Sequence, residues 1–249
     1  MSEEWIYGKN TVLEALRSVR PINKLWLVEG AGKGSMKQLQ QLAKENGVVV
    51  QTVPRKKLDD LSGTSQHQGV VASVAAYHYA EIDDLFDKSS ERGEDPFFLL
   101  LDEIADPHNL GSILRTADAA GAHGVIIPKR RSVGLTQAVA KSSTGAVEHV
   151  PVVRVTNMAR SIEELKTRGL WIAGTDGDGK EDYRDWDASM PLGIVVGSEG
   201  KGISRIVKEK CDFLLTIPME GHVTSLNASV AASLLMYEVY RKRHSLGNV

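Results

Sequence analysis

The chain has 249 residues, 42% hydrophobic and 25% charged, which is typical of a globular protein with one large or two ordinary domains. Its one cysteine, Cys211, excludes an intrachain disulfide and fits a reducing cytoplasm. The net charge of −2 does not by itself indicate a nucleic-acid-binding protein, although residues 1–75 carry 10 Lys/Arg and 7 Asp/Glu.

Alternating helix and strand patterns fill the first 75 residues. A helix is expected from Asn10 or Thr11, which would cap it, to Val19. Further helices are expected over 37–46 and 55–61, and strands over 24–29, 48–53 and 69–77. We therefore predict a compact α/β domain over residues 1–75. The acidic, turn-rich stretch 76–95 is interpreted as a linker with a short helix at 82–86.

The alternation restarts at residue 96. Strands are expected over 97–102, 124–127, 150–155, 170–174, 192–196 and 213–217. Helices are expected over 109–120, 136–141, 158–168 and 226–243, with a turn or two after Ser204. Apolar strands separated by helices predict a parallel sheet covered on both faces, here in a domain over 96–249. Ligands of such sheets bind at the carboxyl ends of the strands.

Several familiar sites are excluded by spacing. The stretch "GAGKGS" has Gly34 after Lys33, so it does not fit the phosphate loop of nucleotide triphosphatases. The dinucleotide fingerprint is missing, and no Cys/His or His/Glu cluster has the spacing of metal ligands, so no metal is expected. The acidic first residues differ from a signal peptide and no apolar run is long enough for a bilayer, so we expect a cytoplasmic protein.

Three loops rich in glycine and amide groups each follow a predicted strand. They are "DPHNLGSILRTADAAGAHGVI" (106–126), "GIVVGSEGKGIS" (193–204) and "IPMEGHVTSLNASVAAS" (217–233). Asn109 is expected to cap the helix in the first loop, and Ser225 the helix 226–243. Each loop alone is better explained as a capped helix or a glycine-rich turn. Their occurrence together on one sheet favours a functional site.

These three stretches resemble motifs one, two and three of the SpoU/TrmH family of RNA ribose 2′-O-methyltransferases, in that order. The match covers about residues 97–243. The N-terminal segment, including "HQGVVASV" (67–74), resembles the RNA-binding domain of members that act on 23S rRNA, and RlmB-type guanosine methyltransferases are the most similar. The departures are small: Ala228 replaces a common valine and Ser233 a common glycine.

The resemblance implies a SPOUT-type C-terminal trefoil knot, S-adenosylmethionine as cofactor, and a homodimer. It implies that Arg115 activates the 2′-hydroxyl, although a permanently charged arginine is better suited to clamp a phosphate and stabilise the developing alkoxide. The catalytic residues would be Asn109, Arg115, Glu199, Ser225 and Asn227. The cofactor-binding residues would be Thr175, Gly197, Ile217, Ser225 and Leu226.

The expected function is methylation of a guanosine ribose in 23S rRNA. Two alternatives stay open: the same reaction on tRNA, and a non-catalytic RNA-binding assembly factor. From the positive charge of residues 1–75 we expect RNA contacts by Lys33, Arg55, Lys56 and Lys57. Because helix 226–243 is apolar on several sides, we also expect it to contribute to the dimer interface, with Leu235 or Ala232 as test positions.

Overall fold

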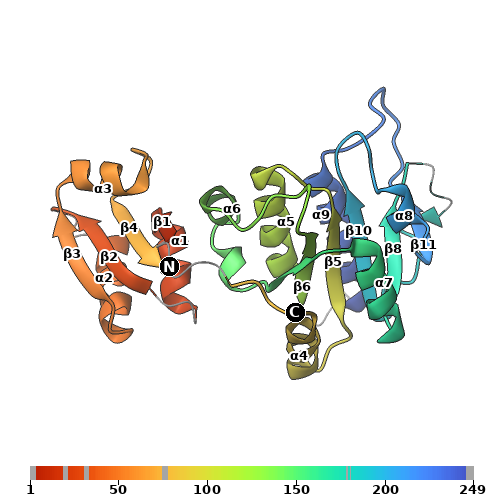
Figure 1. The fold of residues 1–249 in the computed structure, drawn as a ribbon, viewed down its shortest axis with the longest axis horizontal. Helices are drawn as coiled ribbons and strands as arrows, with labels where there is room; N and C mark the ends of the chain where they lie inside the picture. The colour runs from red at the N-terminus through yellow and green to blue at the C-terminus, as the bar shows by residue number, and fades with distance from the viewer. Residues whose placement is uncertain are drawn as a thin grey trace. The chain divides into compact units, whose positions relative to one another are not determined.

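The computed structural model describes residues 4–18, 22–30, 34–74, 78–177, 179 and 181–244. The chain divides into two compact units (Figure 1). Unit 1 comprises Met1–His78 with Leu135–His149, and unit 2 comprises Tyr79–Gly134 with Val150–Val249.

Unit 1 contains a four-stranded sheet in the order β1-β4-β2-β3. Its strands are β1 (Glu4–Tyr7), β2 (Ile22–Val28), β3 (Val49–Val53) and β4 (Val70–Val74), and its N-terminal helices are α1 (Lys9–Arg17), α2 (Ser35–Glu45) and α3 (Arg55–Ser62). Strand β1 pairs antiparallel with β4 and was not predicted, because four residues are too few for a clear alternation. Residues 75–77 of the strand predicted over 69–77 lie outside the described residues.

Helices cover both faces of this sheet. Helices α1 and α2 pack on one face through Leu16 and Leu39, while α3 covers the other through Leu58, against Trp26 and Val71. Helix α1 begins at Lys9 after Gly8, whose φ is 95°, so the predicted capping by Asn10 or Thr11 is wrong. That φ is easily reached only by glycine, which places the turn one residue earlier.

The segment 135–149 packs within unit 1, whereas the sequence places it in the domain 96–249. It contains α6 (Gln137–Ser142) and the short 3₁₀ helix η1 (Ala146–Glu148). His149 Nε2 lies 2.9 Å from Glu14 Oε2, and Lys141 Nζ donates to Gln66 Oε1 at 2.7 Å. These polar contacts join residues far apart in the sequence, which local patterns do not reveal.

Unit 2 contains a seven-stranded sheet in the order β7-β6-β5-β10-β8-β11-β9. The strands are β5 (Phe97–Asp102), β6 (Gly124–Pro128), β7 (Val152–Val155), β8 (Trp171–Thr175), β9 (Glu181–Asp182), β10 (Leu192–Gly197) and β11 (Phe213–Thr216). All the pairings in this sheet are parallel, which confirms the predicted parallel sheet. The unpredicted strand is β9, whose two acidic residues show no apolar pattern.

Two sets of helices cover this sheet (Figure 1). Helices α4 (Ile82–Arg92), α7 (Met158–Thr167) and α8 (Arg205–Lys208) pack on the face that carries Phe98 and Leu100. Helices α5 (Pro107–Ala119) and α9 (Ala228–Arg243) contact each other, and α9 contacts β10. Helix α4 is longer than the predicted 82–86, because a capping box of Glu81 and Asp84 starts it and Gly93 ends it. The trefoil knot stays a prediction.

No helix within the described part of the chain is both long and apolar enough to cross a membrane.

Candidate active site

Asn109 lies in the first turn of α5, after the carboxyl end of β5. It does not cap that helix as predicted. Asp106 is the N-cap, because its Oδ1 accepts a hydrogen bond from the His108 main-chain N at 2.9 Å. Pro107 at the first helical position needs no such partner. The amide of Asn109, which is buried, is therefore available for contacts outside its helix.

Asn227, rather than Ser225, caps α9. Its Oδ1 accepts hydrogen bonds from the main-chain N of Ser229 at 2.9 Å and of Val230 at 3.4 Å. Either residue type is a good cap, so the sequence did not decide between them. Ser225 lies two residues earlier, in an exposed loop.

The structure joins Asn109, Glu199 and Asn227 in one hydrogen-bonded group, called here the amide–carboxylate trio. Asn109 Nδ2 donates to Glu199 Oε1 at 3.0 Å, and Asn227 Nδ2 donates to Asn109 Oδ1 at 2.9 Å. Asn227 Nδ2 also lies within hydrogen-bond distance of Glu199 Oε1. One carboxylate oxygen thus faces two amide donors, which fixes its orientation and leaves the other oxygen for a ligand.

The loop that carries Glu199 is held by close main-chain packing. A Cβ on Gly197 would lie 2.0 Å from the carbonyl carbon of Gly202, so only glycine fits there. The Ser204 N donates to Asp102 Oδ2 at 2.8 Å, and Asp102 is 5% exposed. Asp102 was not predicted as part of the site, although an acidic residue at the end of a fully apolar strand was a usable signal.

Arg115 and Ser225 lie outside the trio. Arg115 is exposed on α5, and neither it nor Ser225 forms a side-chain hydrogen bond or ion pair with another described residue. Both side chains are therefore free to contact a substrate.

The predicted cofactor residues follow three neighbouring strands. Thr175 ends β8, Gly197 ends β10 and Ile217 follows β11. No hydrogen bond joins the main-chain groups of Ile217 or Leu226 to another described residue, which leaves donors and acceptors for a bound group. The Thr175 hydroxyl is instead 3.3 Å from the Val195 carbonyl oxygen.

An open surface pocket of about 580 Å³, called here the cavity, adjoins the trio. It lies among the loops after β5, β6 and β10 and is lined by Glu103, Ala105, Arg131, Ser132, Val133, Ser198, Glu199 and Lys201. Two of the lining residues are paired, since Arg131 Nη1 and Glu103 Oε1 form an ion pair at 2.9 Å. This cavity was not predicted from the sequence, because residues 103 and 131 are brought together only by the pairing of β5 with β6.

In unit 1 the predicted RNA-binding residues Arg55, Lys56 and Lys57 are exposed in the first turn of α3. Lys33 lies outside the described residues. The described side chains include no group of three or more His, Cys, Asp or Glu residues placed to hold a metal ion.

Each of the two units contains a segment that matches a known protein family. Residues 96–237 match the model of the SpoU rRNA Methylase family, and residues 5–80 match that of the RNA 2′-O ribose methyltransferase substrate-binding domain. YacO of Bacillus subtilis (strain 168), assigned to the TrmH family of tRNA/rRNA methyltransferases, is 63% identical over 244 residues, covering 98% of each chain.

Solved structures resemble the chain to different extents. The SpoU methyltransferase AviRb from Streptomyces viridochromogenes, in complex with AdoMet, has a TM-score of 0.82 and 28% identity over 97% of this chain and 90% of its own. An AdoMet-bound rRNA methyltransferase from Sinorhizobium meliloti has a TM-score of 0.80 and 26% identity, with coverages of 98% and 88%. The A. aeolicus TrmH/SpoU tRNA modifying enzyme has a TM-score of 0.55 and 29% identity, with coverages of 60% and 76%.

Three matches lead to one assignment: the family model over unit 2, the second model over the N-terminal segment, and the full-length relative. The chain belongs to the SpoU/TrmH family of RNA methyltransferases.

Proposed function

We propose that the chain methylates the ribose 2′-hydroxyl of a guanosine in 23S rRNA. The amide–carboxylate trio is the observation that carries the proposal, because it places a fixed carboxylate and two amides where three strand-end loops meet. Polar groups oriented before the substrate arrives need no reorganisation during the reaction.

S-adenosylmethionine supplies an activated methyl group, so the protein has to orient the hydroxyl and accommodate the proton that leaves it. Glu199 has one oxygen held by amides and one free to accept a hydrogen bond from the ribose hydroxyl. Arg115 is charged at neutral pH and unpaired among the described residues, so it suits the clamping of a phosphate beside the developing alkoxide. Asn227 completes the hydrogen-bond network within the protein, and the hydroxyl of Ser225 would contact the substrate.

Thr175, Gly197, Ile217, Ser225 and Leu226 would hold the cofactor. Main-chain groups of Ile217 and Leu226 are free for this, since the described residues leave them without partners. Gly197 shapes the loop rather than offering a side chain.

The rRNA substrate is favoured over tRNA by the extent of the structural match. The rRNA methyltransferase from Sinorhizobium meliloti covers 98% of this chain, whereas the tRNA modifying enzyme from A. aeolicus covers 60%. The substrate-binding model over residues 5–80 indicates that the additional part contacts RNA.

The proposal includes a cytoplasmic homodimer. Val230, Leu234 and Tyr237 are 47%, 37% and 50% exposed, and their spacing places them along one side of α9. We call this the α9 stripe and assign it to a second copy of the chain. Leu235 and Ala232, the positions expected from the sequence, are each 0% exposed and belong to the core of the subunit itself.

The test is to map ribose methylation in 23S rRNA and tRNA from cells with and without the protein. Loss of one 2′-O-methylguanosine from 23S rRNA is expected. If 23S rRNA is unchanged and a tRNA site is lost, the tRNA alternative replaces this one. Unchanged methylation in both RNAs would favour the non-catalytic assembly factor.

A further inference from the structure

Both residues of the Glu103–Arg131 ion pair have an unusual main-chain conformation. Glu103 has a φ of 61° and Arg131 a φ of 59°, in the left-handed region that non-glycine residues seldom occupy. The Ser132 Oγ and the Val133 N both donate to the Ile104 carbonyl oxygen at 2.9 Å. The two loops are thus tied together beside the pair. Strained residues held this way cluster at binding sites.

The ion pair between Glu103 and Arg131 contributes little to the stability of the fold, and each side chain can exchange its partner for a ligand. The side chain of Arg131 is 79% exposed and that of Glu103 is 28% exposed. Exposed ion pairs contribute little to stability, so a ligand can replace either partner at low cost. Lys201, on the opposite loop, makes no hydrogen bond or ion pair with another described residue.

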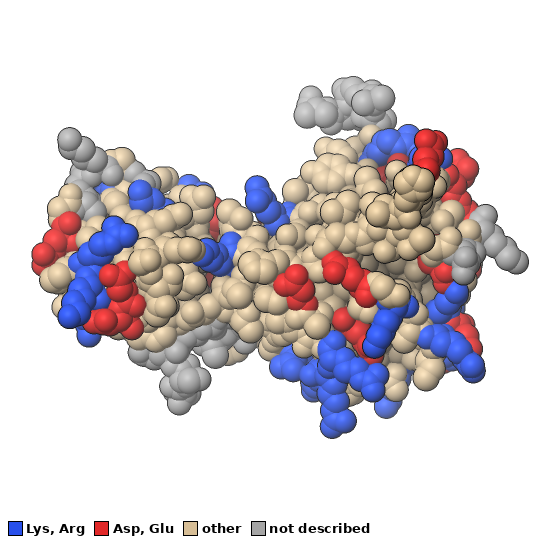
Figure 2. Space-filling view, turned by 90° about the horizontal axis from the view of Figure 1, so that it is seen from above, with Lys and Arg blue, Asp and Glu red and all other residues tan. Residues whose placement is uncertain are grey.

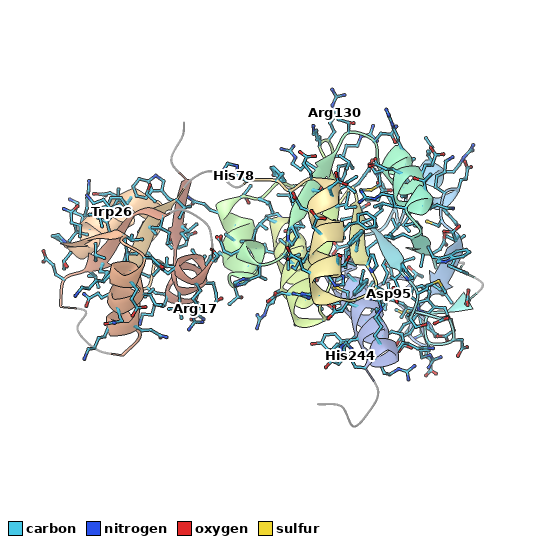
Figure 3. The ribbon with its side chains drawn as sticks, turned by 90° about the horizontal axis from the view of Figure 1, so that it is seen from below. Arg17, Trp26, His78, Asp95, Arg130 and His244 are labelled. Carbon is cyan, nitrogen blue, oxygen red and sulfur yellow. The ribbon has the colours of Figure 1, made fainter. Side chains whose placement is uncertain are left out.

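One of the loops that line the cavity is strongly basic. The loop after β6 begins Lys129-Arg130-Arg131, and Arg130 projects away from the ribbon (Figure 3). Figure 2 shows Lys and Arg side chains gathered at the lower edge of unit 2. Such a surface attracts a phosphate backbone. A cavity of about 580 Å³ is also within the usual size range for binding a small-molecule group such as a nucleobase.

We propose that this cavity receives the base of the target nucleotide, that Glu103 recognises guanine there, and that Arg131 turns to an RNA phosphate. The inference rests on the proposed function. A carboxylate only accepts hydrogen bonds, and of the four RNA bases only guanine offers two adjacent donors, N1–H and the N2 amine, on its pairing edge. Glu199 also lines the cavity, but its Oε1 is already held by Asn109 and Asn227.

The experiment measures methyl transfer to a 23S rRNA transcript whose mapped target nucleotide is guanosine, inosine or adenosine. The wild-type chain should prefer guanosine to inosine, which lacks the N2 amine, and should use adenosine least. The Glu103→Gln variant should lose about tenfold to a hundredfold on guanosine, as expected for one bidentate base contact. Its rate on adenosine should not fall, because a carboxamide both donates and accepts.

Two further variants distinguish recognition of the base from general effects on RNA affinity and on folding. Arg131→Ala should weaken binding of all three transcripts equally and lower the salt dependence of affinity, with the base preference kept. Asp83→Asn is the matched control: it breaks another exposed ion pair of unit 2, Asp83–Arg168 at 2.7 Å, away from the cavity, and should resemble the wild type. Circular dichroism checks folding in each case.

The outcomes are distinguishable. Equal use of guanosine and inosine by the wild-type chain overturns the inference without any variant. A uniform loss on all three transcripts in Glu103→Gln overturns it as well, since that is a structural effect. If the wild-type chain methylates no nucleotide of 23S rRNA, or a nucleotide other than guanosine, the proposed function fails and guanine reading fails with it.

Discussion

Asn227 Nδ2 donates a hydrogen bond to Asn109 Oδ1 at 2.9 Å, while Asn227 Oδ1 caps α9. One side chain therefore fixes both the start of a helix and the orientation of the amide that holds Glu199. The two residues are 118 positions apart in the chain. Because each end of the Asn227 amide is used, the nitrogen can be altered while the capping oxygen is kept.

Asn227→Asp should abolish most methyl transfer while leaving the fold intact. The aspartate still caps α9, but it cannot donate to Asn109 and it adds a second negative charge beside Glu199. Removal of a preorganised hydrogen bond commonly costs about 10²–10³ in rate. Asn157→Asp is the control, since Asn157 caps α7 through Oδ1 in the same way, away from the trio. Equal activity of the two variants would contradict a role for the trio.

Arg115→Ala should reduce methyl transfer by about 10²–10³ and leave S-adenosylmethionine affinity nearly unchanged, because Arg115 lies on α5 and the proposed cofactor residues follow other strands. Arg115→Lys keeps the charge without the planar fork. A fully active lysine variant would show that charge alone suffices. Arg160→Ala, at an exposed arginine of α7, controls for general surface effects. Calorimetry with the cofactor and single-turnover transfer are the measurements.

Replacing Arg55, Lys56 and Lys57 together with alanine should weaken RNA binding and make its affinity less dependent on salt. These cations lie on α3, and the salt slope falls with the number of phosphates that the protein neutralises. Lys37→Ala with Lys44→Ala is the control, because both residues are exposed on α2, which covers the opposite face of the sheet. Identical salt slopes for the wild-type chain and the triple variant would refute RNA binding by α3.

Much of the fold could be predicted because burial leaves a clear pattern. Strands β5 and β10 are buried along their whole lengths and, apart from Asp102 at the end of β5, carry no polar side chain, as a parallel sheet covered on both faces requires. Strands β1 and β9 were missed, because four and two residues carry too little periodicity. The grouping of 135–149 with unit 1 depends on long-range contacts such as that between His149 and Glu14.

The sequence could predict which loops form the candidate site, but not the contacts between their side chains. The convergence of Asn109, Glu199 and Asn227 follows from the order of parallel strands, whose carboxyl ends meet at one edge. The caps were misassigned, since Asp106 and Asn109, or Ser225 and Asn227, are equally acceptable caps. The left-handed main-chain conformation of Glu103 and Arg131 could not be predicted from the sequence, because neither residue is a glycine and only the φ angles in the structure reveal it.

Cys211 should resist alkylation in the native chain. Burial, and secondarily the charge of Asp212, raise the pKa of its thiol to about 12. The reactive thiolate should then be about one molecule in 10⁴ at pH 8, against roughly a quarter for a free cysteine of pKa ~8.5. Iodoacetamide labelling followed by mass spectrometry should be slow in the native chain and fast after denaturation. Rapid native labelling would show that the thiol is accessible and ionised.

Leu234→Arg should convert a dimer into a folded monomer with reduced methyl transfer. Leu234 lies in the middle of the α9 stripe and is 37% exposed, so an arginine there can reach solvent in the monomer but would be buried unpaired against a partner. The start of α9 also carries Asn227, so a partner seated on the stripe would lie near the trio. Separating the subunits should therefore disturb catalysis as well as association.

Light scattering, circular dichroism and methyl transfer together decide this prediction. Ile206→Arg is the matched control, because Ile206 is a 65% exposed apolar residue on α8 of the same unit, outside the stripe, and its variant should remain dimeric and active. Leu235→Arg serves as a second reference: Leu235 is 0% exposed, so an arginine there should unfold the subunit itself. A Leu234→Arg chain that stays dimeric would show that the stripe is not the interface. If it becomes a folded monomer with undiminished methyl transfer, association through α9 would have no part in catalysis.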